Sequence, residues 1–307
     1  MIKKTGLKKD NFLVMILFGL PGIIYLIINN FIPMIMGFVI AFKNVNFSKG
    51  ILGSDWCGFD NFVYLFKTQD AWIITRNTIL YNAAFILTST VFALAIALLI
   101  NEVRARSVFK AYQAIMLFPH LISMLIVSYL VYAFLSVQSG FVNNTILPLL
   151  KMDSISWYSE PGKWPFILVF VYCWKHFGYT SLIYYAAIAN IDPQVYDAAN
   201  IDGANGWNKT FRITIPMIKS TIIVMVLLAV GKIFSAEFGL FYQVPMDSGA
   251  LYSTTNVIDT YVYRALLKSG NIGMSAAACL YQSVVGFLVF SVANLITKKV
   301  SPEDSLF

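Results

Sequence analysis

Six long apolar segments set the main constraint on how this chain can fold. They cover roughly residues 12–42, 72–100, 111–136, 164–190, 219–242 and 273–297. A helix needs about 20 apolar residues to cross a hydrocarbon core of about 30 Å. Charged residues make up only 12% of the 307 residues, about half the share of an average soluble domain. The sequence therefore predicts an all-α membrane protein of about six transmembrane helices, in a single transmembrane domain over residues 1–307.

The first apolar segment follows a basic N-terminus that carries Lys3, Lys4, Lys8 and Lys9. It is longer than the apolar core of a signal peptide, which spans about 7–15 residues, and it lacks a small-residue cleavage site. We therefore predict that it is the first membrane helix. Pro21 and Pro33 predict a kink or break in it, near residues 29–33.

Lysine and arginine residues predict the orientation. With an inside N-terminus and six crossings, the inside segments hold twelve of them and the outside segments hold eight. Three of the inside residues, Arg104, Arg106 and Lys110, share one short connection. Because inside loops of membrane proteins are enriched in Lys and Arg, we expect both termini to be inside.

The net charge of +7 does not point to nucleic acid, because the basic residues lie beside apolar segments rather than in a stripe with aromatic residues. Trp157, Tyr158 and Trp164 surround a predicted outside loop, where such side chains suit the membrane interface. The three cysteines lack the spacing of metal ligands, so no metal site is predicted.

The most informative polar segment is residues 191–218, between the fourth and fifth apolar segments. Asp192 followed by Pro193 is typical of a helix start, and Gly203 is typical of a helix end. The helix between them would have roughly nine residues. Helices shorter than about 12 residues are marginal in water, so this one must pack on its own membrane helices or on another protein.

This segment resembles the EAA loop of ABC importer permeases. In that family the loop begins with an acidic residue and two alanines. Three residues of any type, a glycine, nine residues of any type and the sequence Ile-x-Leu-Pro follow in that order. The corresponding residues are Asp197-Ala198-Ala199, Asn200 to Asp202, Gly203, Ala204 to Arg212, and Ile213-Thr214-Ile215-Pro216. Asp197 replaces the usual Glu and Ile215 the usual Leu, and Ser220 stands where sugar permeases often carry a second proline.

Further residues resemble the carbohydrate-uptake branch of the family, and in particular permeases for oligo- and polysaccharides. They are Asp192-Pro193, Asn205-Gly206-Trp207, Val257 to Arg264, Lys298-Lys299 and Ser305-Leu306-Phe307. The resemblance covers nearly the whole chain, although its specific motifs lie in the second half.

The resemblance implies a type I ABC importer permease fold in a bacterial plasma membrane. The chain would translocate a sugar, expected to be an oligosaccharide, without catalytic residues or a cofactor of its own. The implied partners are a second, homologous but distinct permease, two ATPase subunits that bind ATP and Mg²⁺, and an extracytoplasmic solute-binding lipoprotein. The implied ATPase-coupling residues are Asp197, Ala198, Ala199, Asp202, Gly203, Ala204, Ile213 and Pro216.

Polar residues inside the apolar segments indicate where the sugar passes. A charge at the centre of a membrane helix costs about 2.5–3.5 kcal/mol on insertion scales, so each one requires a reason. One interpretation is a hydrated path, in which aromatic faces stack on sugar rings and polar groups bind hydroxyls. The alternative is an ion pair between helices together with snorkelling lysines. The candidate path residues are Trp174, Lys175, His176, Glu237 and Tyr242.

Three other functions stay open at this point. One is a permease for another solute, such as glycerol phosphate. A cluster of arginines in the spans would favour such an anion, and the spans hold no such cluster. A membrane-embedded transferase would need paired carboxylates or a histidine site near an interface, and the acidic cluster Asp192, Asp197 and Asp202 belongs to the loop motif. A secondary transporter would show repeat symmetry and broken helices at the membrane midplane, and would work without an ATPase.

Overall fold

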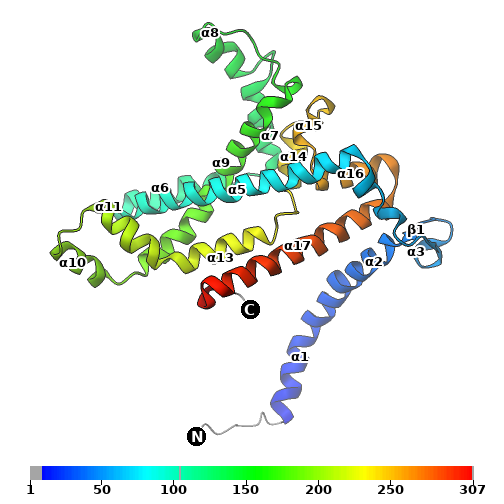
Figure 1. Ribbon diagram of the computed structural model, residues 1–307, viewed down its shortest axis with the longest axis horizontal. Helices are drawn as coiled ribbons and strands as arrows, with labels where there is room; N and C mark the ends of the chain where they lie inside the picture. The colour runs from blue at the N-terminus through cyan, green and yellow to red at the C-terminus, as the bar shows by residue number, and fades with distance from the viewer. Residues whose placement is uncertain (1–8, 104, 306–307) are drawn as a thin grey trace. The chain divides into compact units, whose positions relative to one another are not determined.

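The computed structural model describes residues 9–103 and 105–305, which are mostly helical (Figure 1). The predicted inside residues Lys3, Lys4, Lys8 and Arg104, and the closing Leu306-Phe307, lie outside the described residues. Contacts divide the chain into two compact units. Unit 1 comprises Met1–Phe66 and Arg264–Tyr281, and unit 2 comprises Lys67–Tyr263 and Gln282–Phe307. The expected single transmembrane domain over residues 1–307 stays a prediction.

Unit 1 begins with a long apolar helix. α1 (Lys9–Leu26), the π-helical segment η1 (Ile27–Phe31) and α2 (Ile32–Ala41) follow one another without interruption. Residues 16–41 are long and apolar enough to cross a membrane, and none of their most apolar stretch is buried within the protein. A helix that exposes apolar side chains on every side suits lipid rather than water. This agrees with the predicted first span.

A small hairpin follows this span, which the sequence did not predict. Its elements and those after it are β1 (Lys43–Asn44), α3 (Gly50–Gly53), β2 (Asp55–Trp56), η2 (Asp60–Phe62) and α4 (Tyr64–Lys67). β1 and β2 pair antiparallel. Lys43 is buried, and its ammonium group donates to the carbonyls of Ile51 at 3.3 Å and Leu52 at 2.6 Å. At the exposed edge, Lys49 Nζ lies 2.8 Å from Asp55 Oδ2, and this hydrogen bond and charge lower the pKa of Asp55.

The elements after α4 belong to unit 2, except that Arg264–Tyr281, which takes in the end of α16 and the start of α17, belongs to unit 1. From Gln69 to Ala189 the elements are α5 (Gln69–Asn101), α6 (Arg106–Leu121), α7 (Met124–Leu135), η3 (Val142–Ile146), α8 (Leu147–Leu149), η4 (Trp157–Ser159), η5 (Pro161–Lys163) and α9 (Trp164–Ala189). They are followed by α10 (Pro193–Ile201), α11 (Gly206–Lys209), η6 (Thr210–Thr214), α12 (Ile215–Met217), α13 (Lys219–Val230), α14 (Phe238–Gln243), η7 (Gly249–Leu251), α15 (Tyr252–Thr255), α16 (Ile258–Ser269), α17 (Ile272–Val300) and η8 (Pro302–Asp304).

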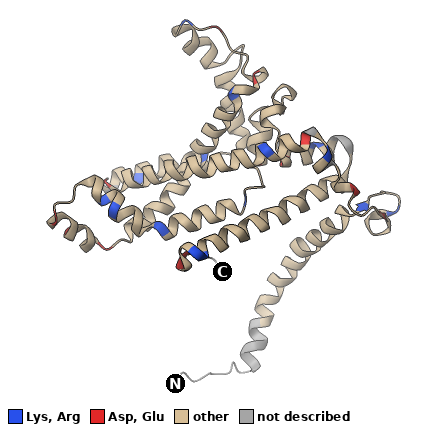
Figure 2. Ribbon diagram, viewed as in Figure 1, with Lys and Arg blue, Asp and Glu red and all other residues tan. Residues whose placement is uncertain are grey.

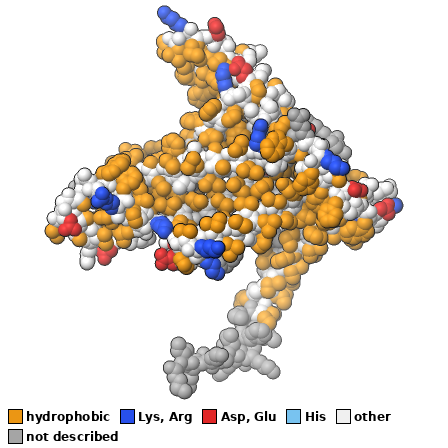
Figure 3. Space-filling model, in the orientation of Figure 1, with side chains coloured by type: hydrophobic (Ala, Val, Ile, Leu, Met, Phe, Trp, Pro, Cys, Tyr) orange, Lys and Arg blue, Asp and Glu red, His pale blue; other side chains and the backbone are white. Residues whose placement is uncertain are grey.

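Within the described residues, four helices are long and apolar enough to cross a membrane, and two bent pairs raise the number to six if each pair is one span. Charged residues lie mostly near helix ends and in connections (Figure 2). Hydrophobic side chains cover much of the visible surface (Figure 3). The predicted spans 72–100, 164–190 and 273–297 correspond to α5, α9 and α17.

The other two predicted spans are interrupted. The segment 111–136 covers most of α6 and all of α7, which meet at a 93° bend after Leu121. The segment 219–242 is not one helix, because α13 ends at Val230 and residues 231–237 are non-helical before α14 begins. A second bend, of 60°, separates residues 206–217 from α13.

Hydrogen bonds from three other helices satisfy the non-helical segment 231–237. The Asn82 side chain donates to the carbonyls of Ile233 at 2.9 Å and Ser235 at 3.2 Å. Gln282 Nε2 donates to the Phe234 carbonyl at 2.7 Å. Asp259 Oδ2 accepts from the Ala236 N–H at 2.8 Å and from Gln282 Nε2 at 3.0 Å. Non-helical backbone is tolerated at membrane depth where the protein supplies such partners.

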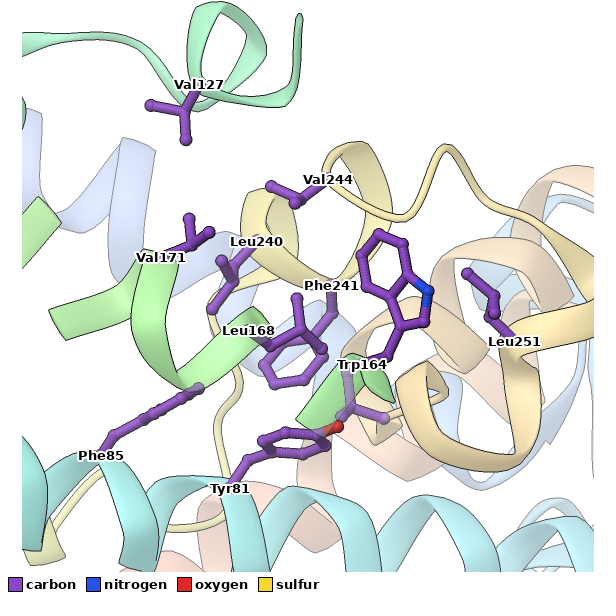
Figure 4. Packing of buried hydrophobic residues seen from close by; sticks show 11 residues of the cluster. Tyr81, Phe85, Val127, Trp164, Leu168, Val171, Leu240, Phe241, Val244 and Leu251 are labelled. Carbon is purple, nitrogen blue, oxygen red and sulfur yellow. The ribbon is translucent and has the colours of Figure 1, made fainter. Parts of the chain in front are cut away.

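The main core of unit 2 joins α5, α7, α9 and the region around α14 (Figure 4). Its buried residues are Tyr81, Phe85, Val127, Trp164, Leu168, Val171, Leu240, Phe241, Val244, Leu251 and Val257. The expected interfacial position of Trp164 is wrong, since its side chain is fully buried. Its indole N–H donates to the Trp157 carbonyl at 2.7 Å, which lets the ring enter the core without an unpaired donor. Tyr158 packs against the same core, and burial raises the pKa of its hydroxyl.

Three π-helical segments each end two residues before a proline. η1 precedes Pro33, η3 precedes Pro148 and η6 precedes Pro216. In each, the N–H after the segment donates to the carbonyl five residues back. Proline has no N–H, and its ring crowds the carbonyl four residues back. A π-turn widens the helix at that point. The kink or break predicted near residues 29–33 is therefore a π-helical segment in a continuous helix.

Candidate coupling segment and intramembrane polar cluster

Residues 191–218, the coupling segment, contain the predicted nine-residue helix α10, which follows the end of α9 (Figure 1). Asp192 Oδ1 accepts from the Gln194 N–H at 2.9 Å, and Pro193 occupies the first helical position. These two features start the helix. The carboxylate accepts from an N–H that has no partner inside the helix, and proline has no N–H that would require a partner. The predicted start and length of this helix are confirmed.

Gly203 ends α10 with a left-handed backbone, at φ +73°. The Gly203 N–H donates to the Asn200 carbonyl at 3.1 Å, and the Ala204 N–H donates to the Ala199 carbonyl at 2.9 Å. This pair of bonds is a Schellman motif, which closes helix ends through a residue of positive φ. A Cβ at Gly203 would meet nothing within 4 Å. The backbone conformation, and not crowding inside this chain, therefore favours glycine here.

α10 has a packed face and an exposed face. Ala199 is buried, and the Tyr196 hydroxyl lies 2.9 Å from Thr214 Oγ1 in η6. Tyr196 also packs on a buried cluster formed by Ala93, Ala97, Tyr184, Ile188, Ile191 and Ile218. Asp197 and Ala198 are exposed, and Ile201 is 87% exposed. The helix thus packs on its own bundle through one face and leaves the other open.

The remaining coupling residues lie at the edges of this arrangement. Asp202 is exposed at the end of α10, Ala204 and Ile213 are half-buried, and Pro216 is exposed after η6. The sequence reasoning missed the large apolar side chains of this segment. Trp207 is 72% exposed, and its ring packs on Phe211 with centroids 4.2 Å apart. Their spacing of four residues on a short helix was the available signal.

The structure brings two of the predicted path residues together inside the bundle. His176 Nε2, on α9, lies 3.0 Å from Glu237 Oε2, at the start of α14. Both side chains are partly accessible, at 24% and 31% exposure. A carboxylate between apolar spans is stabilised by such a partner. This hydrogen-bonded pair crosses between α9 and the non-helical segment.

Aromatic rings surround this pair. His176 lies 4.5 Å from the ring of Tyr172, which stacks on Phe85 at 3.9 Å, and 5.6 Å from His120. His120 in turn stacks on Tyr179 at 4.9 Å. Tyr172, His176 and Tyr179 are spaced at i, i+4 and i+7, so they share one helix face. We call His120, Tyr172, His176, Tyr179 and Glu237 the polar cluster. The helical spacing was the signal that would have added the two tyrosines to the prediction.

Lys175 has a different environment. Its side chain is buried, and its ammonium group donates to the carbonyls of Pro119 at 3.4 Å, His120 at 3.3 Å and Ile122. These carbonyls lie at the end of α6, where the 93° bend leaves them without helical partners. A cation is also favourable at a helix C-terminus. An ammonium group has three protons to donate, and three carbonyls already accept from this one. No proton is left for a sugar hydroxyl, so these contacts favour a structural role for Lys175 over sugar binding.

Trp174 and Tyr242, the other predicted path residues, contact different groups. Trp174 is half-buried and packs against the main core. Tyr242 stacks on Phe238 with centroids 5.0 Å apart, and meets Tyr263 edge-on at 5.1 Å. In the described part of the chain, no group of three or more His, Cys, Asp or Glu side chains is arranged to hold a metal ion.

Comparison with known proteins identifies the family. Residues 89–302 match the model of the binding-protein-dependent transport system inner membrane components. Protein LplB of Bacillus subtilis is 34% identical over 97% of this chain and 92% of its own length. The polygalacturonan/rhamnogalacturonan transport system permease protein YteP of the same organism is 32% identical over 92% of this chain and 87% of its own.

The fold also matches solved structures. One chain in the crystal structure of a bacterial alginate ABC transporter, in complex with an alginate pentasaccharide-bound periplasmic protein, superposes with a TM-score of 0.85. It is 32% identical, and the match covers 95% of this chain and 96% of that one. The predicted family and fold class are therefore confirmed. The chain belongs to the binding-protein-dependent transport system inner membrane components and is a membrane-embedded, non-catalytic permease subunit of an ABC transporter.

Proposed function

We propose that the chain is one permease of an ATP-driven importer that carries an oligosaccharide or polysaccharide fragment across a bacterial plasma membrane. The coupling segment carries this proposal, since its helix exposes Asp197, Ala198 and Ile201 rather than packing them on this chain. The relatives support the choice of solute, because YteP is named for polygalacturonan and rhamnogalacturonan and the matched structure is an alginate transporter.

The exposed face of α10 supports a contact with a separate ATPase subunit. Ala198 and Ile201 present a small and a large apolar side chain on a short helix that polar residues keep out of the membrane. Exposed apolar groups in a polar setting mark interaction sites. The ATPase would bind ATP and Mg²⁺ in its own site and move α10 as it closes. Asp197, Ala199, Asp202, Gly203, Ala204, Ile213 and Pro216 would shape and support this contact.

The polar cluster supports a sugar path. His176 and Glu237 offer donors and acceptors for hydroxyl groups, and the tyrosines offer faces on which sugar rings stack. Trp174 and Tyr242 stay candidate path residues by the same aromatic chemistry. The further expected partners are a second, distinct permease, a second ATPase subunit, and an extracytoplasmic binding lipoprotein that delivers the sugar.

Uptake by the whole complex tests this function. The complex would be reconstituted in liposomes with the two permeases, the ATPase and the binding protein encoded beside it. Labelled oligogalacturonides, alginate oligosaccharides, maltooligosaccharides and glycerol phosphate would be offered with and without ATP. We expect ATP-dependent uptake of at least one oligosaccharide. Uptake of glycerol phosphate alone, or sugar uptake that persists without the ATPase, would contradict the proposal.

A further inference from the structure

The end of the described chain folds back onto the start of α13. After α17, the turn η8 brings the Asp304 N–H to the Ser301 carbonyl at 3.0 Å. Lys219, the first residue of α13, donates from Nζ to Ser301 Oγ at 2.8 Å. This bond ties the C-terminal turn to the helix that directly follows the coupling segment.

A pocket of about 470 Å³ lies where the C-terminal turn meets α13. Its lining combines apolar side chains of α9 and α13 with the hydroxyl-bearing residues Ser220 and Thr221 and the acidic residues Glu303 and Asp304. We call this the tail pocket. With Ser305, the lining holds two carboxylates and three hydroxyl groups, which give it several hydrogen-bond acceptors and suit a ligand that donates.

Asp304 is the unusual member of the tail pocket. The residue is only 4% exposed, and its buried Oδ1 has no hydrogen-bond partner. Among the described residues, no ion pair includes Asp304 or Glu303. Lys219 bonds Ser301 instead, and Lys298 and Lys299 are exposed at the end of α17. A carboxylate oxygen withdrawn from water without a partner is unfavourable, so Oδ1 of Asp304 calls for a donor from elsewhere.

We propose that the tail pocket receives a lysine or arginine side chain of the ATPase subunit, as a second contact beside α10. This inference rests on the proposed function. The pocket has the opposite charge to such a side chain, and its apolar part suits the methylene stem. Its α13 residues begin at Ser220, two residues after the coupling segment ends, so the pocket is formed partly by the helix that directly follows the segment proposed to bind the ATPase. The pairing would satisfy Asp304 only in the assembled complex.

The proposal predicts that loss of the Asp304 charge weakens the complex without destabilising the free chain. Asp304→Asn removes the unpaired charge, so the chain purified without the ATPase should keep or raise its thermal midpoint. The same variant should bind the ATPase at least about tenfold more weakly, because it removes one partner of a buried charge pair. The amount of ATPase that co-purifies with this chain at increasing salt would measure the second effect. Glu102→Gln, an exposed acid at the end of α5, is the matched control and should change neither quantity.

A second variant tests the pocket without changing charge. Thr221→Trp fills the space and should also lower the amount of co-purified ATPase. Wild-type retention of the ATPase by both Asp304→Asn and Thr221→Trp would overturn the inference. A lowered midpoint of the free Asp304→Asn chain would also overturn it, because the carboxylate would then already be satisfied within this chain. If the wild-type chain co-purifies with no ATPase, the proposed function itself fails.

Discussion

The coupling segment and the polar cluster are assembled over very different sequence distances. In the coupling segment, Asp192 bonds a residue two positions away and Tyr196 meets Thr214 eighteen positions away. In the polar cluster, His176 and Glu237 are 61 residues apart. The first is formed by turns and helix ends, and the second exists only once α6, α9 and α14 have packed. Local changes should therefore alter coupling with little effect on the bundle, whereas changes near the cluster should alter the bundle itself.

The largest expected effect is that of Lys175→Met. The substitution leaves three carbonyls at the α6–α7 bend without their donor, and an unsatisfied buried polar group costs about 1–3 kcal/mol. We expect a large loss of folded protein and a lower thermal midpoint, measured by size-exclusion chromatography after heating. Lys232→Met, at an exposed lysine, is the control. Normal stability with abolished sugar uptake would instead identify Lys175 as a path residue.

Substitutions of Gly203 should have the next largest effect and should spare the bundle. A β-branched residue in the left-handed region costs about 1–2 kcal/mol, whereas asparagine tolerates it better. We expect Gly203→Val to impair ATP-driven uptake strongly and Gly203→Asn to retain most of it, with both chains normally folded. Gly206→Ala, at a glycine with open space and no positive φ, is the control. Equal loss in Val and Asn variants would mean that bulk against the ATPase matters more than backbone conformation.

Glu237→Gln should have a smaller effect on stability and a selective effect on transport. The amide still reaches His176, and a partly exposed pair contributes about 1 kcal/mol or less. If the cluster binds sugar through the charged carboxylate, uptake should require about tenfold more loaded binding protein for half-maximal rate. Glu160→Gln, an acid paired with Lys163 away from the cluster, is the control. Unchanged uptake would remove Glu237 from the sugar path.

The smallest expected effect concerns the hairpin in unit 1. Lys49 lowers the pKa of Asp55 below 3.8, so the pair stabilises the hairpin above that pH and the contribution is lost as the pH falls through the lowered pKa. Since both side chains are exposed, the change should be slight. The protection factors of the β1 and β2 amides, which correct for the intrinsic pH dependence of hydrogen exchange, should fall slightly between pH 5 and pH 3, and Asp55→Asn should abolish that fall. A large change would mean that the hairpin depends on another acid.

Sequence alone was sufficient for the parts that local chemistry determines. The start and length of α10 follow from Asp192, Pro193 and Gly203, and the spans from apolar length. The bend after α6 and the non-helical residues 231–237 were missed, because their partners, Lys175, Asn82 and Gln282, are distant in the chain. Trp164 was predicted at the membrane interface because an indole ring, apolar with one N–H donor, suits that setting. The structure buries it instead, since the carbonyl of Trp157 in a neighbouring turn accepts its N–H. The charged residues Lys175 and Glu237 within the spans indicated that each has a hydrogen-bonding partner, but the sequence could not identify those partners.

The π-helical segments before Pro33, Pro148 and Pro216 have a consequence for the direction in which side chains point. Each adds one residue to a helical turn, and one residue of an α-helix corresponds to a rotation of about 100°. Residues that the 3.6-residue period would assign to one face of the helix therefore point in a different direction after the π-helical segment than before it. Deleting a single residue from η6 would turn α12 by about that angle against α11 and present different side chains to its neighbours. The direction of α12, the last helix of the coupling segment before α13, thus depends on one additional residue in η6.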